Sequence, residues 1–175
     1  MRKLILVLPR LEEKIHFVAG ALFGCALITL ASCIRMDSYP VPFTLQTMAI
    51  FVLGLWQSPK KAASSAVCYL VCATLGLPVL GGKVNPFWIL GPTGGYLIGF
   101  PFAAFLLAFF RERRALVLGF TLAQGVIWLL GWLWLSFFLG PQAAFCHGVA
   151  IFFLSALYKV LASFFLYQGR RLWFP

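Results

Sequence analysis

The sequence predicts an all-α integral membrane protein, a bundle of six transmembrane helices with a glycine-rich extracellular loop between the third and fourth. Of its 175 residues, 62% are hydrophobic and 10% are charged, whereas a soluble domain carries about 25% charged residues. Five long stretches contain no Asp, Glu, Lys or Arg; they are residues 15–34, 38–59, 62–82, 84–110 and 115–158. The alternating ten-residue segments typical of a membrane barrel are absent, so helices are the expected spans.

The charge-free stretches are long enough to cross a membrane, because about 20 residues at 1.5 Å each span a hydrocarbon core of about 30 Å. The first four hold one span each, and the fifth, with 44 residues and a break at Gly140-Pro141, holds two. The expected spans are 15–34, 43–58, 62–79, 93–110, 115–139 and a last one that starts near 143 or near 153 and ends near 170. Residues 15–172 therefore form one predicted transmembrane domain.

Residues 1–14 are predicted to be a short cytoplasmic lead rather than a secretory signal. Their apolar stretch ends at Pro9 after five residues, which is shorter than the 7–15-residue core of a signal. In the first span, Gly20 and Gly24 lie four residues apart, a spacing that lets a second helix approach closely. They either pack inside this bundle or form a docking face for another subunit.

The second span follows two prolines, Pro40 and Pro42, and opens with Thr44 and Gln46. Gln46 is either an interfacial residue or a polar group that faces the bundle, where its amide offers both a donor and an acceptor. The fifth span is rich in tryptophan, which faces lipid more often than a ligand. Residues 140–152 either begin the sixth span or lie in the outer interface.

The net charge of +10 predicts an orientation rather than nucleic-acid binding. With a cytoplasmic N-terminus, 11 of the 14 basic residues fall on the cytoplasmic side, at residues 2–14, 60–61, 111–114 and 170–171. Only Arg35 and Lys83 fall outside, and Lys159 falls within a span. This is a positive-inside pattern, and it places both termini in the cytoplasm and anionic lipid beside the basic turns.

The chain lacks recognisable catalytic or metal-binding equipment. Its four acids lie at membrane edges or in loops, its two histidines lie apart, and its five cysteines show no ligand spacing. The cysteines are expected to be small packing residues. Residues 91–96, Gly-Pro-Thr-Gly-Gly-Tyr, are not a nucleotide-binding loop, which ends in Gly-Lys-Ser/Thr and follows a strand. ATP is therefore expected to bind only to partner subunits.

Lys159 is the exception within the spans. An intramembrane lysine costs at least about 2.5 kcal/mol on insertion scales, so it should face the bundle or a wet cavity. Ser155 and Ser163 lie four residues before and after it and would form a small polar face. Snorkelling to the interface is the alternative; a start of the last helix near 143 weakens it, and a start near 153 leaves it open. Because no acid lies within a span, an anionic ligand is the expected counter-charge.

Three segments together resemble the BioY family of biotin transporters, the substrate-binding S components of energy-coupling-factor (ECF) transporters. The segments are Pro40-Val41-Pro42-Phe43-Thr44-Leu45-Gln46-Thr47, Gly76-Leu77-Pro78-Val79 and Gly91-Pro92-Thr93-Gly94-Gly95-Tyr96. The resemblance covers nearly the whole chain. It implies a six-helix bundle in a bacterial cytoplasmic membrane, a biotin site near the outer surface, and a loop between spans 3 and 4 that folds over the ligand.

The resemblance also implies particular residues and partners. Family members commonly carry an Asp and a Lys near the start of the last helix that contact biotin; here Lys159 is kept and Ala156 replaces the Asp. An ECF T component, docking on Gly20 and Gly24, and two ATPases would energise transport. The expected substrate-binding residues are Lys159, Asn85, Tyr96, Gln46, Thr44, Gly81, Gly82, Lys83, Trp88, Gly91, Thr93, Gly94 and Gly95.

Biotin also fits the residues on chemical grounds. Its ureido group, apolar thioether ring and carboxylate call for an apolar pocket with a few placed polar groups. Lys159, Lys83 and Arg35 are the candidate cations for the carboxylate. Because Ala156 leaves the ureido N–H groups without the usual acceptor, an S component for another small vitamin is an alternative. A small polytopic membrane enzyme is a further alternative, which the lack of paired in-membrane acids disfavours.

Overall fold

The computed structural model describes residues 2–36 and 41–173, with side chains over 12–36 and 41–169. Helices make up most of the described chain, as the all-α class predicts. In chain order the elements are α1 (Arg2–Cys33), β1 (Arg35–Met36), β2 (Phe43–Thr44), α2 (Gln46–Trp56), α3 (Pro59–Thr74), the 3-10 helix η1 (Trp88–Leu90), α4 (Gly94–Glu112), α5 (Leu116–Leu139), α6 (Pro141–Phe145), the π-helix η2 (Cys146–Ala150) and α7 (Phe153–Trp173).

Local sequence chemistry sets several helix ends. Pro59 opens α3 directly after Ser58, and proline suits the first helical position because its missing N–H would have no intrahelical partner there. At the end of α5, Gly140 has φ +80° and ψ 157°, an extended conformation with positive φ that is essentially restricted to glycine. Pro141 follows at once and starts α6 in a new direction.

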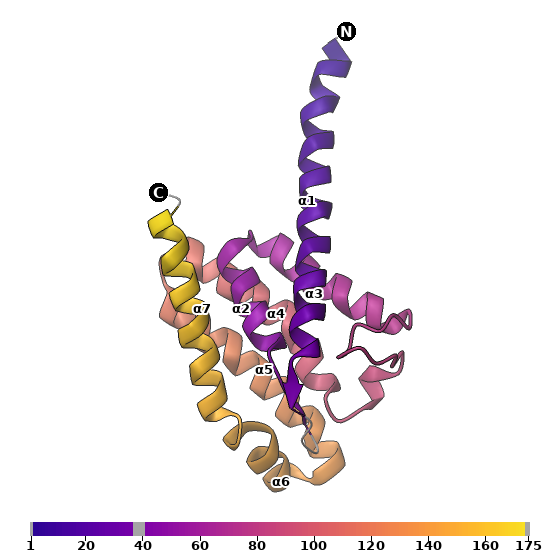
Figure 1. Ribbon diagram of the computed structural model, residues 1–175, viewed down its shortest axis with the longest axis vertical. Helices are drawn as coiled ribbons and strands as arrows, with labels where there is room; N and C mark the ends of the chain where they lie inside the picture. Colours follow the sequence, from indigo (N-terminus) through magenta and orange to yellow (C-terminus); the bar gives the residue numbers. More distant parts are fainter. Residues whose placement is uncertain (1, 37–40, 174–175) are drawn as a thin grey trace.

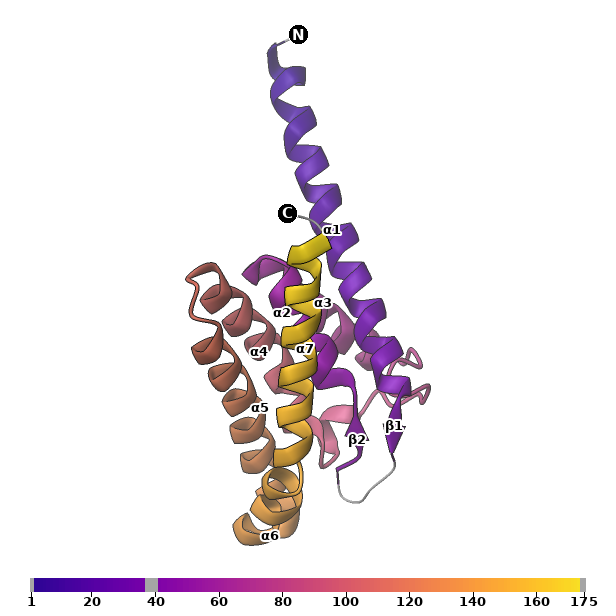
Figure 2. The same cartoon turned by 60° about the vertical axis from the view of Figure 1, so that its left-hand side comes forward.

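The connections between the helices lie at two opposite ends of the molecule. The N-terminal part of α1 projects beyond the other helices at the end where α7 also finishes (Figure 1). The α2–α3 and α4–α5 turns lie toward this same end, whereas α6 and the short β1–β2 hairpin lie toward the other (Figure 2). Those two turns adjoin the basic segments 60–61 and 111–114, so the basic turns share one end with the termini.

The span predicted at 43–58 is a short helix enclosed by protein. α2 has 11 residues and α3 has 16, which at 1.5 Å per residue gives lengths of about 17 and 24 Å. Residues 49–55 of α2 are all buried, and the helix packs against α1, α3, α4 and α7. The apolar character that predicted a lipid-facing span therefore reflects burial inside the bundle, and neither helix reaches the predicted length.

Within the described residues, four helical segments are long and apolar enough to cross a membrane: Glu12–Cys33, Gly94–Glu112, Leu116–Leu139 and Pro141–Gly169. The fourth segment is interrupted, since α6 and η2 precede a turn and α7 begins at Phe153. This is the later of the two predicted starts of the last helix. The predicted lead 1–14 is helical, since α1 runs without a break from Arg2 into the first predicted span.

Glycines bring α4 and α5 into close contact. A Cβ built on Gly95 would overlap the carbonyl oxygen of Leu130 and the side chain of Trp134 on α5, and one on Gly99 would lie 3.1 Å from the Cα of Ile127. At the basic end of the bundle, Arg111 donates a 2.6 Å hydrogen bond to the carbonyl of Leu55 at the end of α2. This side chain satisfies a carbonyl that the helix end leaves without a partner.

Candidate functional site

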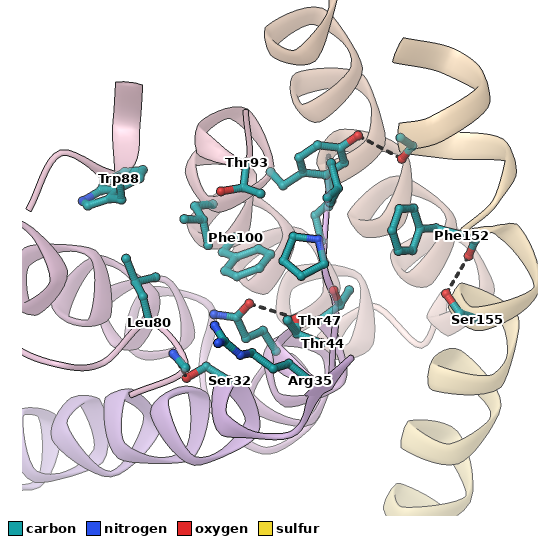
Figure 3. Close-up of a pocket in the computed structure, with 18 of the residues that line it drawn as sticks. Ser32, Arg35, Thr44, Thr47, Leu80, Trp88, Thr93, Phe100, Phe152 and Ser155 are labelled. Atoms are coloured by element: carbon teal, nitrogen blue, oxygen red, sulfur yellow. Dashed lines mark hydrogen bonds between the residues drawn. The ribbon is translucent and has the colours of Figure 1, made fainter. Parts of the chain in front are cut away.

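A cavity of about 450 Å³ lies inside the bundle, among the β1–β2 hairpin, residues 80–88 and the helices α4, α5 and α7. Leu80 and Trp88 lie on one side of this cavity, and Phe152 and Ser155 lie on the opposite side (Figure 3). Its volume is within the range of about 300–1,000 Å³ that is typical of small-molecule sites. The walls combine aromatic rings with a few polar groups, which suits an amphipathic solute.

The cavity brings together nine of the thirteen residues that the sequence nominated for substrate binding. These are Thr44, Gln46, Gly81, Lys83, Asn85, Trp88, Thr93, Tyr96 and Lys159. The remaining four, Gly82, Gly91, Gly94 and Gly95, do not line it. Gly94 and Gly95 instead pack against the 3-10 turn and α5, so their small size serves helix packing. Gly91 accepts a 3.0 Å hydrogen bond from Trp134 through its carbonyl.

Gly81 and Gly82 form a tight turn at the edge of the cavity. Their φ angles are +64° and +75°, and Lys83 N–H donates to the Leu80 carbonyl across the turn at 3.2 Å. Two successive positive φ values are typical of a hairpin turn that favours glycine at both positions. At Gly81 space matters as well, because a Cβ there would lie 2.8 Å from Nη1 of Arg35. The turn therefore lets backbone lie directly against the Arg35 guanidinium.

Hydrogen bonds from α1 and α3 fix the position of this turn. Ser32 donates to the carbonyl of Val79 at 2.7 Å and accepts from the N–H of Gly81 at 2.9 Å. Tyr69 of α3 also donates to Val79, at 3.3 Å. Trp88, further along the same loop, donates to the hydroxyl of Thr74 at 3.0 Å. The loop over the cavity is thus tied to the bundle at several points.

Gln46 takes part in this supporting network. Its Oε1 accepts a 2.9 Å hydrogen bond from Thr44, and its Nε2 donates to the hydroxyl of Tyr69. The side chain is 8% exposed. Gln46 therefore faces the bundle and not the interface, which is the second of its two predicted positions. Because both ends of the amide already bond to protein, Gln46 positions the cavity wall and the loop.

Tyr96 presents its ring to the cavity and uses its hydroxyl elsewhere. The hydroxyl donates a 2.9 Å hydrogen bond to the carbonyl of Gly148 in η2. A Cβ on Gly148 or on Gly131 would overlap the tyrosine side chain. Tyr96 therefore joins α4 to α5 and to the segment that leads into α7, and its aromatic face is the part available to a solute.

Lys159 faces the bundle although α7 starts only six residues before it. Its side chain is 8% exposed and lines the cavity, and its Nζ lies 4.4 Å from the centre of the Phe43 ring, a cation–π distance. Within the described part of the chain, its ammonium has no carboxylate partner. The snorkelling alternative is therefore wrong, and a buried cation at the α2–α7 side of the cavity is available for an anion.

The predicted polar face around Lys159 is not formed by serine hydroxyls. Ser163 donates to the carbonyl of Lys159 itself at 2.7 Å, and Ser155 donates to the carbonyl of Phe152 at 2.9 Å. Each hydroxyl thus bonds back to its own helix or to the turn before it, as serine commonly does in helices. Ser155 still lines the cavity, whereas Ser163 does not.

Sequence reasoning did not nominate several residues that line the cavity. They are Ser32, Thr47, Phe100, Gln124, Ile127, Trp128, Phe152 and Ser155, among others. Trp128 belongs to the tryptophans of the fifth span, for which a lipid-facing position is the favoured prediction; instead it lines the cavity and stacks on Phe153 with ring centres 5.9 Å apart. Gln124 carried a weak signal, since it is a lone amide in the long apolar stretch 115–139.

Gly20 and Gly24 do not form an open docking face. A Cβ on Gly20 would overlap the Lys61 side chain at 2.6 Å, and one on Gly24 would overlap Ser65. Gln57 donates to the Gly20 carbonyl at 2.8 Å and accepts from Ser65 at 2.9 Å. The two glycines therefore let α1 pack on α3, which is the first of the two interpretations that their spacing allowed.

The cysteines are more clustered than the sequence suggests. The sulfur atoms of Cys25, Cys68 and Cys72 lie within 4.8 Å of one another at the α1–α3 contact. The expectation that the chain has no cluster of metal-ligating side chains was therefore wrong. Cys25 and Cys68 are 43 residues apart in the sequence, so their spacing does not reveal that α1 and α3 bring them together. The cluster lies outside the cavity wall. Three thiolates in a nonpolar helix contact without a neighbouring cation would be costly, so neutral packing thiols remain the better interpretation.

Together these features define the class of the protein: a polytopic helical membrane protein with an internal solute-sized cavity and a buried cation in its wall. The model of the BioY family matches residues 8–174. The chain belongs to the BioY family.

Comparisons with individual proteins agree with this assignment. The chain is 37% identical over 141 residues to a probable biotin transporter BioY of Pyrococcus horikoshii, covering 79% of this chain and 85% of the relative. It is 38% identical over 140 residues to a biotin transporter BioY of Lactococcus lactis subsp. cremoris, covering 72% and 74%. A crystal structure of the S-component for biotin from an ECF-type ABC transporter superposes with a TM-score of 0.79 and 27% identity, covering 91% of this chain and 93% of that one.

Proposed function

We propose that this chain binds biotin in the internal cavity and carries it across the membrane as the S component of an ECF-type transporter. Family membership and the similarity to an S component for biotin support this assignment. The observation in the structure that carries it is Lys159, a buried cation in the cavity wall that has no carboxylate partner among the described residues. A carrier of a small anionic vitamin needs such a group.

The cavity matches the three chemical parts of biotin. Lys159 pairs with the carboxylate, since a buried ammonium gains most from a full opposite charge. The aromatic walls, formed by residues such as Phe100, Trp128 and Phe152, receive the apolar ring system. Asn85 and the turn at Gly81 supply polar groups on the loop side. Arg35 and Lys83 make the mouth of the cavity positive, which favours arrival of an anion.

The orientation in the membrane follows from the distribution of charge. The chain crosses a bacterial cytoplasmic membrane six times when α2 and α3 are counted as short crossings supported by their neighbours, with both termini in the cytoplasm. Supporting this arrangement, the segments that carry Lys60, Lys61 and Arg111 share one end of the molecule with the termini. The loop 75–93 then lies on the outer side and covers the cavity where biotin arrives.

Energy for transport comes from other subunits. The described chain contains no nucleotide-binding loop of the glycine-lysine type, so an ECF T component and two ATPases are the expected partners, and the chain itself uses no cofactor. In this chain Gly20 and Gly24, the predicted docking positions, pack against α3.

An S component for another small vitamin is the second candidate. It is favoured by Ala156, which is 6% exposed and lines the cavity at the position where the family commonly has an Asp. Loss of a carboxylate from the cavity wall removes two acceptor oxygens and changes which polar groups the site satisfies. Competition among vitamins for the purified chain separates this candidate from biotin.

Biotin uptake by whole cells tests the proposed function. Biotin-auxotrophic cells that express this chain together with an ECF T component and ATPases are expected to accumulate labelled biotin well above vector controls at nanomolar supply. A matched strain carries the Lys60→Met variant, which removes an exposed cation far from the cavity and should take up biotin like wild type. No accumulation above vector, despite assembly of all the subunits, would contradict transport.

A further inference from the structure

Gln124 of α5 is a buried amide whose hydrogen-bonding capacity the protein does not use. The side chain is 9% exposed, and its Oε1 is fully buried with no hydrogen-bond partner among the described residues. An unsatisfied buried acceptor is unusual, since most buried polar atoms in native proteins are paired. Gln124 lines the cavity, so the missing donor is expected to come from the cavity side.

The level of Gln124 in the bundle can be read from its neighbours. α5 and α7 run in opposite directions (Figure 2), and they meet where the Trp128 ring of α5 stacks on the Phe153 ring of α7. Gln124 lies four residues before Trp128, and Ala156 lies three residues after Phe153. At 1.5 Å per residue, Ala156 and Gln124 lie about 4.5 and 6 Å further along the same direction. Gln124 and Ala156 therefore line the cavity at about the same level, one on α5 and the other on α7.

The chemistry of the amide selects one part of the ligand. Oε1 is an acceptor and needs an N–H donor, which a carboxylate or a thioether cannot supply. A cyclic urea carries two N–H donors beside one carbonyl, so an amide can accept from the N–H and donate through Nε2 to the carbonyl. Either orientation of the amide offers this pair of groups. Gln46, the other glutamine in the wall, is already bonded to Thr44 and Tyr69.

We propose that Gln124 is a specificity-determining residue that binds the ureido group of the substrate, and that it supplies the acceptor that Ala156 does not. This inference rests on the proposed function, because it takes biotin as the ligand. It assigns the ureido end to the α5 side of the cavity, whereas the Lys159 ammonium of α7 reaches toward Phe43 of β2. The two polar ends of the ligand are thus held by different helices.

The test measures equilibrium binding of biotin and of biotin methyl ester to purified wild type, Gln124→Leu and Gln124→Met. Loss of a buried hydrogen bond that leaves the ligand N–H unpaired is expected to raise the dissociation constant about tenfold or more. The factor should be the same for the ester, which keeps the ureido group and lacks the anionic carboxylate. Both apo variants should melt at or above the wild-type temperature, because the substitution removes an unsatisfied buried acceptor.

A matched control and a rescue sharpen the result. Gln168→Leu makes the same change at an exposed position of α7 outside the cavity and should bind like wild type. Adding Ala156→Asp to Gln124→Leu restores an acceptor at the same level and should recover most of the lost affinity. Binding within twofold of wild type, a loss for biotin but not for its ester, or failure of both variants to fold would each overturn the role of Gln124. No biotin binding by the wild type would instead overturn the proposed function.

Discussion

Replacing Lys159 with methionine is expected to raise the dissociation constant for biotin by at least about 30-fold. Removing one partner of a buried charge pair costs roughly 2–5 kcal/mol, and each 1.4 kcal/mol is about tenfold in affinity. Methionine keeps an unbranched side chain of similar length, so the space beside the Phe43 ring stays filled. Equilibrium dialysis of labelled biotin against the purified variant, or titration calorimetry, measures the change.

Two further readouts separate binding by Lys159 from a structural role. Biotin methyl ester, which lacks the anionic charge, should bind the variant and the wild type with similar affinity. The apo variant should melt no lower than wild type, because a buried ammonium without a counter-charge is costly. Lys60→Met, at an exposed position in α3, is the matched control. Unchanged affinity for biotin in Lys159→Met would remove this residue from the site.

Replacing Gly95 with alanine is expected to destabilise the fold by roughly 1–3 kcal/mol or more, the cost of overpacking a core. The added methyl group would overlap the Leu130 carbonyl oxygen and the Trp134 side chain, and backbone atoms cannot rotate away as a flexible side chain can. α4 and α5 would have to separate, which also disturbs Tyr96 and Thr93 at the cavity. A lower thermal midpoint in detergent, with weaker biotin binding, is the expected measurement.

Gly125→Ala provides the control for this substitution. Gly125 is an exposed residue of α5, and a Cβ built on it would have no neighbouring atom within 4 Å. Because alanine favours a helix by about 1 kcal/mol over glycine, this variant should melt at or above the wild-type temperature. If Gly95→Ala proved as stable as Gly125→Ala, the close α4–α5 contact described for these residues would be incorrect.

The helical class could be predicted from the charge-free stretches, because each is long enough for a transmembrane helix and none shows the alternating pattern of a membrane barrel. Length was harder. Residues 43–58 read as a lipid-crossing span, yet α2 occupies only Gln46–Trp56 and is enclosed by other helices. Hydropathy reports that a segment avoids water and does not distinguish lipid from protein as its surroundings. The start of α7 at Phe153 depends on the turn after η2, which no strong turn signal marks.

Much of the cavity wall could be predicted because its residues belong to short sequence segments, such as Thr44 with Gln46 and Gly81 with Asn85. Glycine was ambiguous, since the same residue serves a turn at Gly81 and a helix contact at Gly95. Gln124 carried only the weak sequence signal of a lone amide in an apolar stretch. Its significance depends on its missing partner and on the facing Ala156, and both require the pairing of α5 with α7.

The most direct test of the account is equilibrium binding of labelled biotin to the purified chain, with thiamine, riboflavin and niacin as unlabelled competitors. The account predicts saturable binding of one biotin per chain, displaced by unlabelled biotin and by none of the other three vitamins at similar concentrations. Absence of saturable binding, or displacement by one of those vitamins in preference to biotin, would contradict it.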